Sequence, residues 1–148
     1  MGATLDALLL LMLAGIPLSA LLAGNRFGRW LLVVLYVAQL LLLVALQPGA
    51  TVHRSQLAFD LLGNRIGWQL DAMGWFFGLI TIGAAGFAAA YAAGEWGDVR
   101  RRAGRSLRWL YAGLQINVLA MLLLLSAADF ISLFIGWELT SWAGLILM

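Results

Sequence analysis

The chain has 148 residues, of which 64% are hydrophobic and only 11% are charged, and its mean hydropathy is +0.95. Because a soluble domain has roughly 45–50% apolar and about 25% charged residues, this composition excludes an ordinary soluble protein and predicts an integral membrane protein. The net charge is only +2, and the basic residues are segregated along the chain, so nucleic acid is not an expected partner. The absence of cysteine excludes disulfides and thiolate metal sites.

Five hydrophobic runs follow one another, and about 20 apolar residues are enough to cross a bilayer core. We expect helices at about 4–23, 30–46, 72–94, 109–127 and 130–148, which together form one all-α transmembrane domain over residues 1–148. The first run contains Asp6 and has no basic residue before it. We therefore interpret it as a retained first helix rather than a signal peptide.

The arginines, which are the only basic residues apart from one histidine, predict the orientation of the helices. Seven lie in the first and third loops, namely Arg26, Arg29, Arg100, Arg101, Arg102, Arg105 and Arg108, and two lie in the second loop, namely Arg54 and Arg65. Because cytoplasmic loops are enriched in basic residues, the first and third loops are expected in the cytoplasm and the N-terminus outside. The cluster in the third loop is expected to contact lipid headgroups, and a specific partner site is the alternative.

The second loop, from residue 47 to residue 70, is long for a helical bundle. Gly63, Asn64 and Arg65 separate two short apolar runs and predict the turn of a short outer hairpin. His53 has no second candidate ligand near it in the sequence. We expect it to be a solvated loop residue rather than a metal ligand.

The third helix combines a capping residue with many small residues. Asp71 precedes it and is expected to be its N-cap, because a carboxylate accepts hydrogen bonds from the free backbone N–H groups there. Gly74 and Gly78 are four residues apart, and Gly86 begins a second series of small residues with that spacing. Such spacing lets helices approach closely in lipid, so we expect this helix to lie inside the bundle.

Glu138 is the most unusual residue of the fifth helix, because it lies near the middle of an apolar run. A comparable Asp at bilayer depth costs roughly 2.5–3.5 kcal/mol on insertion scales, and acids in such positions are usually functional. Ser141 and Trp142 share its face, whereas Gly136 and Gly144 lie on an adjacent face with Thr140. We expect Glu138 to face the bundle interior as a proton-transfer group, and the alternative is a structural carboxyl paired across helices.

Two further polar residues, Gln115 and Asn117, lie in the fourth helix. An interhelical hydrogen bond is the expected role of such groups in lipid. A role in the passage of water or protons is the alternative.

Three stretches together resemble one family of membrane proteins. They are LDAMGWFFGLI at 70–80, AAAYAAGEW at 88–96 and LLSAADFISLFIGWELTSWAGLILM at 124–148. The set resembles the antiporter-like subunits, which include the large proton-pumping subunits of respiratory complex I, the Mrp-type sodium/proton antiporters, membrane-bound hydrogenases and inorganic-carbon transporters. The WELTS run is most similar to the Mrp-type and carbon-transporter branch. The resemblance covers about residues 70–148, and the first two helices match only in hydropathy.

The resemblance implies roles for three residues. Glu138 matches a glutamate that pairs, in the family, with a lysine on the seventh helix and tunes its pKa during ion movement. Asp71 matches an acid before the third helix, and Tyr91 matches a tyrosine near the cytoplasmic end of that helix. Asn117 and Ser141 are further candidate supporting polar residues. The resemblance also implies a multi-pass protein of a bacterial-type inner membrane.

The chain departs from the family in one large respect, because members have many more helices, arranged in two inverted repeats. This sequence ends with the fifth helix and contains no lysine, so the Glu–Lys pair cannot form within it. Three interpretations stay open: the chain is a fragment, other membrane subunits supply the lysine-bearing helices as its expected partners, or transport has been lost. The expected function is therefore an N-terminal module of a proton- or cation-translocating subunit. The alternative is a truncated, transport-inactive homologue that acts as a structural or assembly subunit.

The sequence has no nucleophile–base pair, metal-ligand cluster or phosphate-binding loop. We therefore expect no active site and no cofactor in this chain, although it is compatible with a subunit of an ion-translocating oxidoreductase. The coupled reaction stays open between quinone reduction, hydrogen evolution, sodium exchange and carbon uptake.

Overall fold

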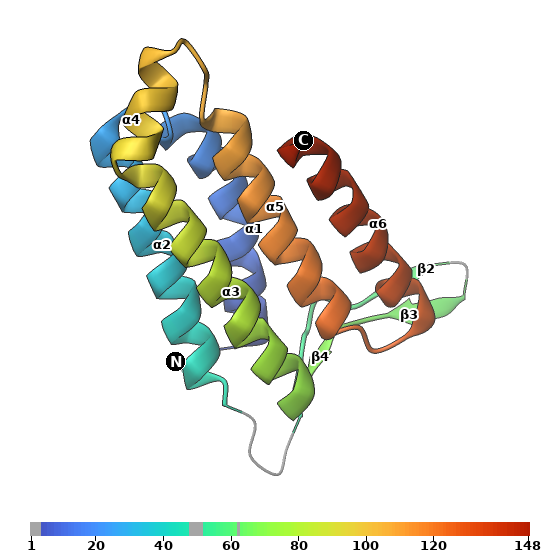
Figure 1. The fold of residues 1–148 in the computed structure, drawn as a ribbon. Helices are drawn as coiled ribbons and strands as arrows, with labels where there is room; N and C mark the ends of the chain where they lie inside the picture. The colour runs from blue at the N-terminus through green and yellow to red at the C-terminus, as the bar shows by residue number, and fades with distance from the viewer. Residues whose placement is uncertain (1–3, 48–51, 62) are drawn as a thin grey trace.

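The structure, a computed structural model, describes residues 4–47, 52–61 and 63–148. Within these residues the chain forms six helices (Figure 1): α1 Leu5–Leu22, α2 Arg26–Ala45, α3 Ala72–Ala93, α4 Glu95–Arg102, α5 Arg108–Leu125 and α6 Phe130–Leu147. All but α4 are long and apolar enough to cross a membrane. The all-α prediction is confirmed, and each long helix coincides with a predicted run.

Helix α2 begins four residues earlier than predicted, at Arg26, because Asn25 acts as its N-cap and accepts a hydrogen bond from the Gly28 N–H. The structure adds α4 in a region that we had treated only as a loop. Its first turn carries Glu95 and Asp98, and its last turn carries three arginines. This distribution complements the helix dipole at both ends, which favours a helix despite the polar sequence.

Helix α5 is the centre of the bundle, since it contacts α1, α3 and α6. The expectation that the third helix lies inside the bundle is wrong in part. Helix α3 packs between α2 and α5, but Phe76, Ile80 and Phe87 on its other face are exposed. Helix α6 packs against α5 at the edge of the bundle (Figure 1) and buries the smallest share of its length among the long helices.

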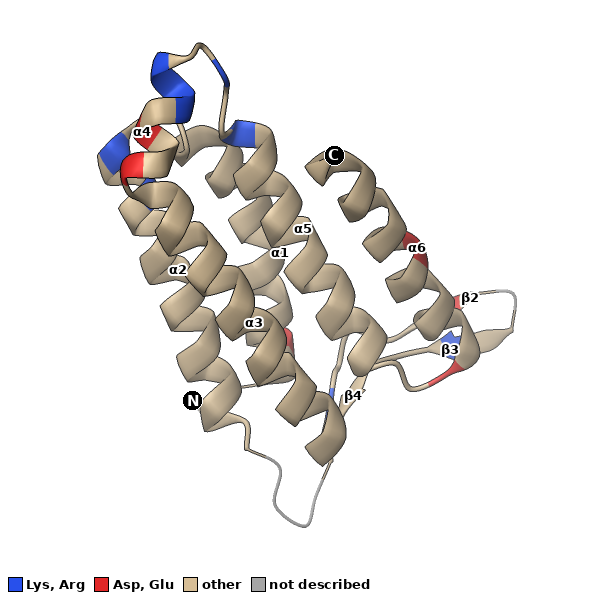
Figure 2. Ribbon diagram, in the orientation of Figure 1, with Lys and Arg blue, Asp and Glu red and all other residues tan. Residues whose placement is uncertain are grey.

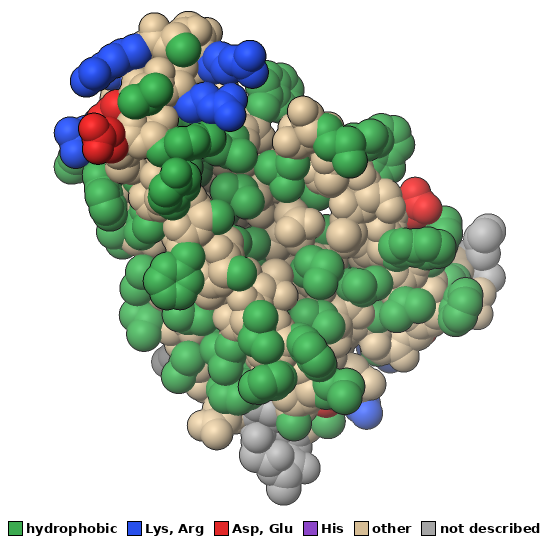
Figure 3. Space-filling view, viewed as in Figure 1, with side chains coloured by type: hydrophobic (Ala, Val, Ile, Leu, Met, Phe, Trp, Pro, Cys, Tyr) green, Lys and Arg blue, Asp and Glu red, His purple; other side chains and the backbone are tan. Residues whose placement is uncertain are grey.

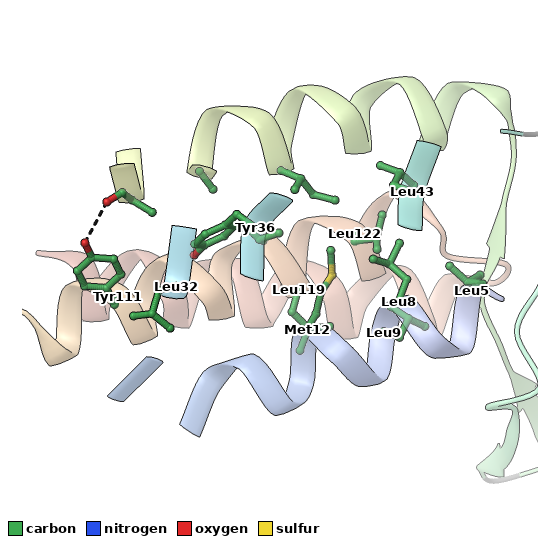
Figure 4. Close-up of a cluster of buried hydrophobic side chains, with 14 of the residues drawn as sticks. Leu5, Leu8, Leu9, Met12, Leu32, Tyr36, Leu43, Tyr111, Leu119 and Leu122 are labelled. Atoms are coloured by element: carbon green, nitrogen blue, oxygen red, sulfur yellow. Dashed lines mark hydrogen bonds between the residues drawn. The ribbon is translucent and has the colours of Figure 1, made fainter. Parts of the chain in front are cut away.

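Leucines and polar groups share the core between α1, α2, α3 and α5 (Figure 4). The Tyr111 hydroxyl of α5 donates to the Ala89 carbonyl of α3 at 2.9 Å. The Gln115 side chain donates to the Met12 carbonyl of α1 at 3.2 Å. Each bond ties α5 to a different neighbour, and such bonds are worth on the order of 1 kcal/mol in membrane bundles.

The second loop forms two short antiparallel pairs at the end of the bundle opposite α4 (Figure 1). Strand β1 (His53–Arg54) pairs with β4 (Gln69–Leu70), and β2 (Phe59–Leu61) pairs with β3 (Asn64–Ile66). The predicted hairpin is therefore present. The turn uses Gly63 at φ 80°, a conformation that favours glycine. Residues 48–51 and 62 of the predicted loop lie outside the described residues.

The loop is attached to the helix ends by hydrogen bonds. Asp6 at the start of α1 accepts from the Ser55 hydroxyl and from the Gln56 N–H at 3.0 Å. The Gln69 N–H donates to the Ser126 carbonyl at the end of α5 at 2.6 Å. The hairpins therefore form a cap that links α1 to the turn between α5 and α6.

Candidate functional site

Glu138 lies near the middle of the 18-residue helix α6, and its side chain is exposed. Figure 2 shows one acidic position on the α6 ribbon, which is Glu138 because α6 contains no other acid. Among the described residues, the only ion pairs are those that Arg26 and Arg29 form with Asp98. The Glu138 carboxylate therefore has no cationic partner in this part of the chain.

The packing of α6 on α5 determines where Glu138 points. The buried positions of α6 are Ser132, Gly136 and Ala143. A Cβ on Gly136 would lie 2.6 Å from the Leu124 backbone nitrogen, so the two helices touch there. Residues two positions apart on a helix are separated by about 200°, so Glu138 must point away from α5. The expectation that Glu138 faces the interior of these five helices is wrong.

The outer face of α6, which we define by Phe134, Trp137, Glu138, Trp142 and Leu145, is otherwise apolar and aromatic. The exposed fractions of Trp137, Trp142 and Leu145 are 61%, 61% and 63%. This face therefore fits lipid or a further helix better than water.

The hydroxyl groups of α6 are satisfied within the helix. Ser141 donates to the Trp137 carbonyl at 3.2 Å, and Thr140 donates to the Gly136 carbonyl at 2.9 Å. The predicted supporting role of Ser141 is thus not a contact with Glu138. Of the predicted small-residue stripe, Gly136 contacts α5, but a Cβ on Gly144 would meet no atom within 4 Å.

The structure does not bring the other candidate polar residues to Glu138. Asp71 is the N-cap of α3 and accepts from the Gly74 N–H at 2.7 Å. Tyr91 lies near the opposite end of α3, where it is 67% exposed and its ring centroid is 5.8 Å from that of Trp96. Asn117 is half-buried in α5. These residues are separate features along the bundle rather than one cluster.

The glycines of α3 differ in how tightly they pack. A Cβ on Gly74 would lie 2.8 Å from the Leu125 carbonyl oxygen, and one on Gly78 would lie 3.0 Å from Leu43. A Cβ on Gly86 would make an ordinary contact with Tyr36 at 3.4 Å. Close approach is therefore concentrated in the half of α3 nearest the hairpins.

Sequence reasoning missed the role of Arg29, which it counted only as an orientation signal. The Arg29 side chain is completely buried and donates a hydrogen bond to Asp98 of α4, whereas Arg26 is 66% exposed and lies 3.7 Å from the same carboxylate. A signal for its burial was available, because Arg29, Leu32 and Tyr36 share one face of α2. The hydrogen bond from Arg29 is the main reason that the pKa of Asp98 is held below its usual value.

Asp129 joins α6 to the hairpin cap. Its carboxylate accepts from the N–H groups of Ile131 and Ser132, both at 2.9 Å, and from the Gly67 N–H at 3.0 Å. Partial burial raises the pKa of Asp129, but these hydrogen bonds together lower it more, so it lies below its usual value. Ser132 completes a capping box with this residue. The start of α6 is therefore firmly fixed.

In the described part of the chain, no group of three or more His, Asp or Glu side chains is placed to hold a metal ion. No protein-family model, curated protein or solved structure matches this chain. The function must therefore be argued from the residues and their geometry.

Proposed function

We propose that this chain is the N-terminal module of a proton- or cation-translocating, antiporter-like membrane subunit that acts within a larger complex. The observation that carries the proposal is Glu138, an acid at the middle of a long apolar helix, on a face that no described residue covers. Burying such a group in lipid without a partner is costly. A basic group from another helix offsets that cost and lets the pair exchange protons.

The resemblance of the last 25 residues to the antiporter-like family supports the same assignment, because the family pairs the matching glutamate with a lysine. Low dielectric raises the pKa of a carboxyl group, and a nearby cation lowers it. Glu138 then tunes the protonation of a lysine that a neighbouring segment or subunit supplies.

The proposal includes a location and an orientation. The five apolar helices cross a bacterial-type inner membrane, with the N-terminus and the hairpin cap outside and α4 in the cytoplasm. The distribution of arginines supports this orientation, since seven lie at the α4 end and two in the second loop. The partners are the lipid bilayer and the membrane subunits that complete the ion path.

A structural subunit is the second candidate, and the outer face of α6 favours it. Only 17% of the positions in this span are buried, and its exposed side chains include the aromatic residues Phe134, Trp137 and Trp142. Such a face can dock onto a larger complex through apolar contacts, with Glu138 as a hydrogen-bonding group. In that case, assembly rather than transport depends on the outer face.

One experiment on the complex that contains this chain distinguishes the transport function from the structural function. Glu138→Gln keeps the shape of the side chain and removes its charge, and Glu95→Gln is the control because Glu95 is exposed in α4. Proton or sodium flux is measured in liposomes, and assembly by the mass of the purified complex. We expect Glu138→Gln to reduce flux to that of empty liposomes while assembly and the control stay normal. Normal flux in Glu138→Gln would contradict transport through this residue, and a loss of assembly would favour the structural candidate.

A further inference from the structure

A cavity of about 290 Å³ lies at the arginine-rich end of the bundle, between the α1–α2 turn and the loop that joins α4 to α5. Its charged lining residues are Arg101, Arg105 and Arg108, and Ser106 adds a hydroxyl group. Figure 2 shows that basic positions of the chain gather at this end of the molecule, and Figure 3 shows basic side chains there. Three arginines thus contribute to the lining of one concave site.

The lining of the cavity is positively charged. None of its lining residues is acidic. The nearby Asp98 carboxylate is occupied by Arg26 and Arg29, which form the only ion pairs among the described residues. Like charges this close repel one another. An anion that enters the cavity removes the repulsion and accepts hydrogen bonds from planar guanidinium groups, a geometry suited to phosphate.

The backbone adds to the attraction. Helix α5 starts beside the cavity, and Leu107 at its N-cap provides no side-chain hydrogen bond. The first N–H of the helix, from Arg108, reaches only the Ser106 hydroxyl, at 3.3 Å. The N-terminus of an 18-residue helix therefore presents N–H groups and a positive dipole end to the site.

Gly24 lines the cavity on the side of the α1–α2 turn, and its lack of a side chain leaves space there. A Cβ at this position would have the Arg108 Nη2 atom at 3.8 Å and no closer neighbour. The glycine has an ordinary negative-φ backbone, so a side chain is sterically allowed there. A large residue at position 24 would fill the cavity without changing its charge, which provides an independent test.

We propose that this cavity binds the phosphate group of an anionic phospholipid. The shared chemistry is a phosphate anion, which free phosphate also offers, but the surroundings favour a lipid. Trp109, which follows Arg108, and Leu21, two residues before Ala23, are 70% and 75% exposed at the ends of apolar helices. A phosphate attached to acyl chains gains apolar contacts beside the cavity that free phosphate does not. Basic pockets at the ends of transmembrane helices are a known setting for such lipids.

The test measures lipid retention by native mass spectrometry on the purified protein, in its full complex, after addition of phosphatidylglycerol or phosphatidylcholine. The test variant combines Arg101→Gln with Arg108→Gln. The matched control combines Arg100→Gln with Arg102→Gln, which removes the same amount of charge from α4 but outside the cavity lining. We expect phosphatidylglycerol affinity to fall by about tenfold or more in the test variant and to stay nearly unchanged in the control.

Gly24→Leu keeps every arginine and should weaken phosphatidylglycerol binding to a similar extent. Thermal unfolding of each variant identifies any that are misfolded. Gly24→Leu changes the volume of the cavity and the arginine variant changes its charge, so the two variants test the site independently. Equal losses in test and control variants would overturn the site, because general surface charge would then explain binding. Equal retention of phosphatidylcholine would also overturn it. Displacement of the lipid by millimolar inorganic phosphate would assign the cavity to free phosphate rather than to lipid.

Discussion

A buried arginine shows most clearly how the fold gives individual residues their roles. Arg29 and Arg26 are three residues apart, yet Arg29 is completely buried and Arg26 is largely exposed. Burying a guanidinium group requires a carboxylate partner, because desolvation of an unpaired charge is very costly. Asp98 of α4 provides that partner. The ion pairs of Asp98 with Arg29 and Arg26 therefore help to hold the polar helix α4 against the apolar bundle.

We expect Asp98→Asn to lower the thermal stability of the protein in detergent, because it leaves Arg29 buried without a counter-charge. Glu95→Gln removes an acid from the same helix that forms no ion pair with a described residue, and it should be nearly neutral. Unfolding followed by tryptophan fluorescence measures both. Equal stability of the two variants would show that the Arg29 contact does not hold α4.

The same pair predicts a pH dependence. Since the folded state holds the pKa of Asp98 below 3.8, the pair contributes stability that is present above that pH. It is lost as the pH falls through the lower pKa of the folded state. Acidification from pH 5 toward about pH 3 should therefore destabilise the wild type more than Asp98→Asn.

At the scale of elements, the contact between α5 and α6 decides what α6 presents to its surroundings. Gly136 lies against the Leu124 backbone, whereas Gly144 on the same helix has open space around it. Helix α5 is the main helix that α6 contacts among the described residues, and the approach at Gly136 holds α6 there together with the close approach of Gly113 to Leu147. The direction of the Glu138 carboxyl group depends on the contact between Gly136 and Leu124, because this contact fixes the rotation of α6 about its axis.

We expect Gly136→Leu to destabilise the protein by about 1–3 kcal/mol, because overpacking forces the two backbones apart. Gly144→Leu adds the same side chain eight residues further along α6 and should be nearly neutral. Chemical unfolding in detergent measures both changes. A large cost at Gly144 would mean that α6 has a partner surface beyond α5.

The helices were predictable from sequence, but the face that each one buries was not. The long apolar runs predicted the five long helices, because mean hydropathy depends only on the composition of each run. In lipid, however, both faces of a helix are apolar. The positions of Phe134, Trp137 and Leu145 therefore do not indicate whether their face packs against another helix or contacts lipid. One signal was available, since Gly136 and Glu138 are two residues apart and cannot share a face. The pairing of Arg29 with Asp98 was not predictable, because the two residues are 69 positions apart.

At the scale of the whole molecule, the two ends of the bundle differ in chemistry. One end carries α4, seven arginines and the basic cavity, and the other carries the hairpin cap with two arginines (Figure 2). Between them the surface is mainly apolar (Figure 3). With the membrane insertion that we propose, this asymmetry predicts a preferred orientation, because cytoplasmic loops are enriched in arginine, which associates with anionic headgroups there.

This asymmetry gives a direct test of orientation. The chain contains no cysteine, so a single introduced thiol reports one position without background from this polypeptide. Ala103 follows α4 and Asn64 lies in the hairpin, and both are exposed. With a membrane-impermeant maleimide, we expect Asn64→Cys to be labelled in intact cells. Ala103→Cys should be labelled only after permeabilisation, because seven arginines against two favour a cytoplasmic α4. The reverse pattern would invert the bundle and place the basic cavity on the outer leaflet. Labelling of both positions in intact cells would contradict the membrane-spanning arrangement, since the two ends must then face the same solution.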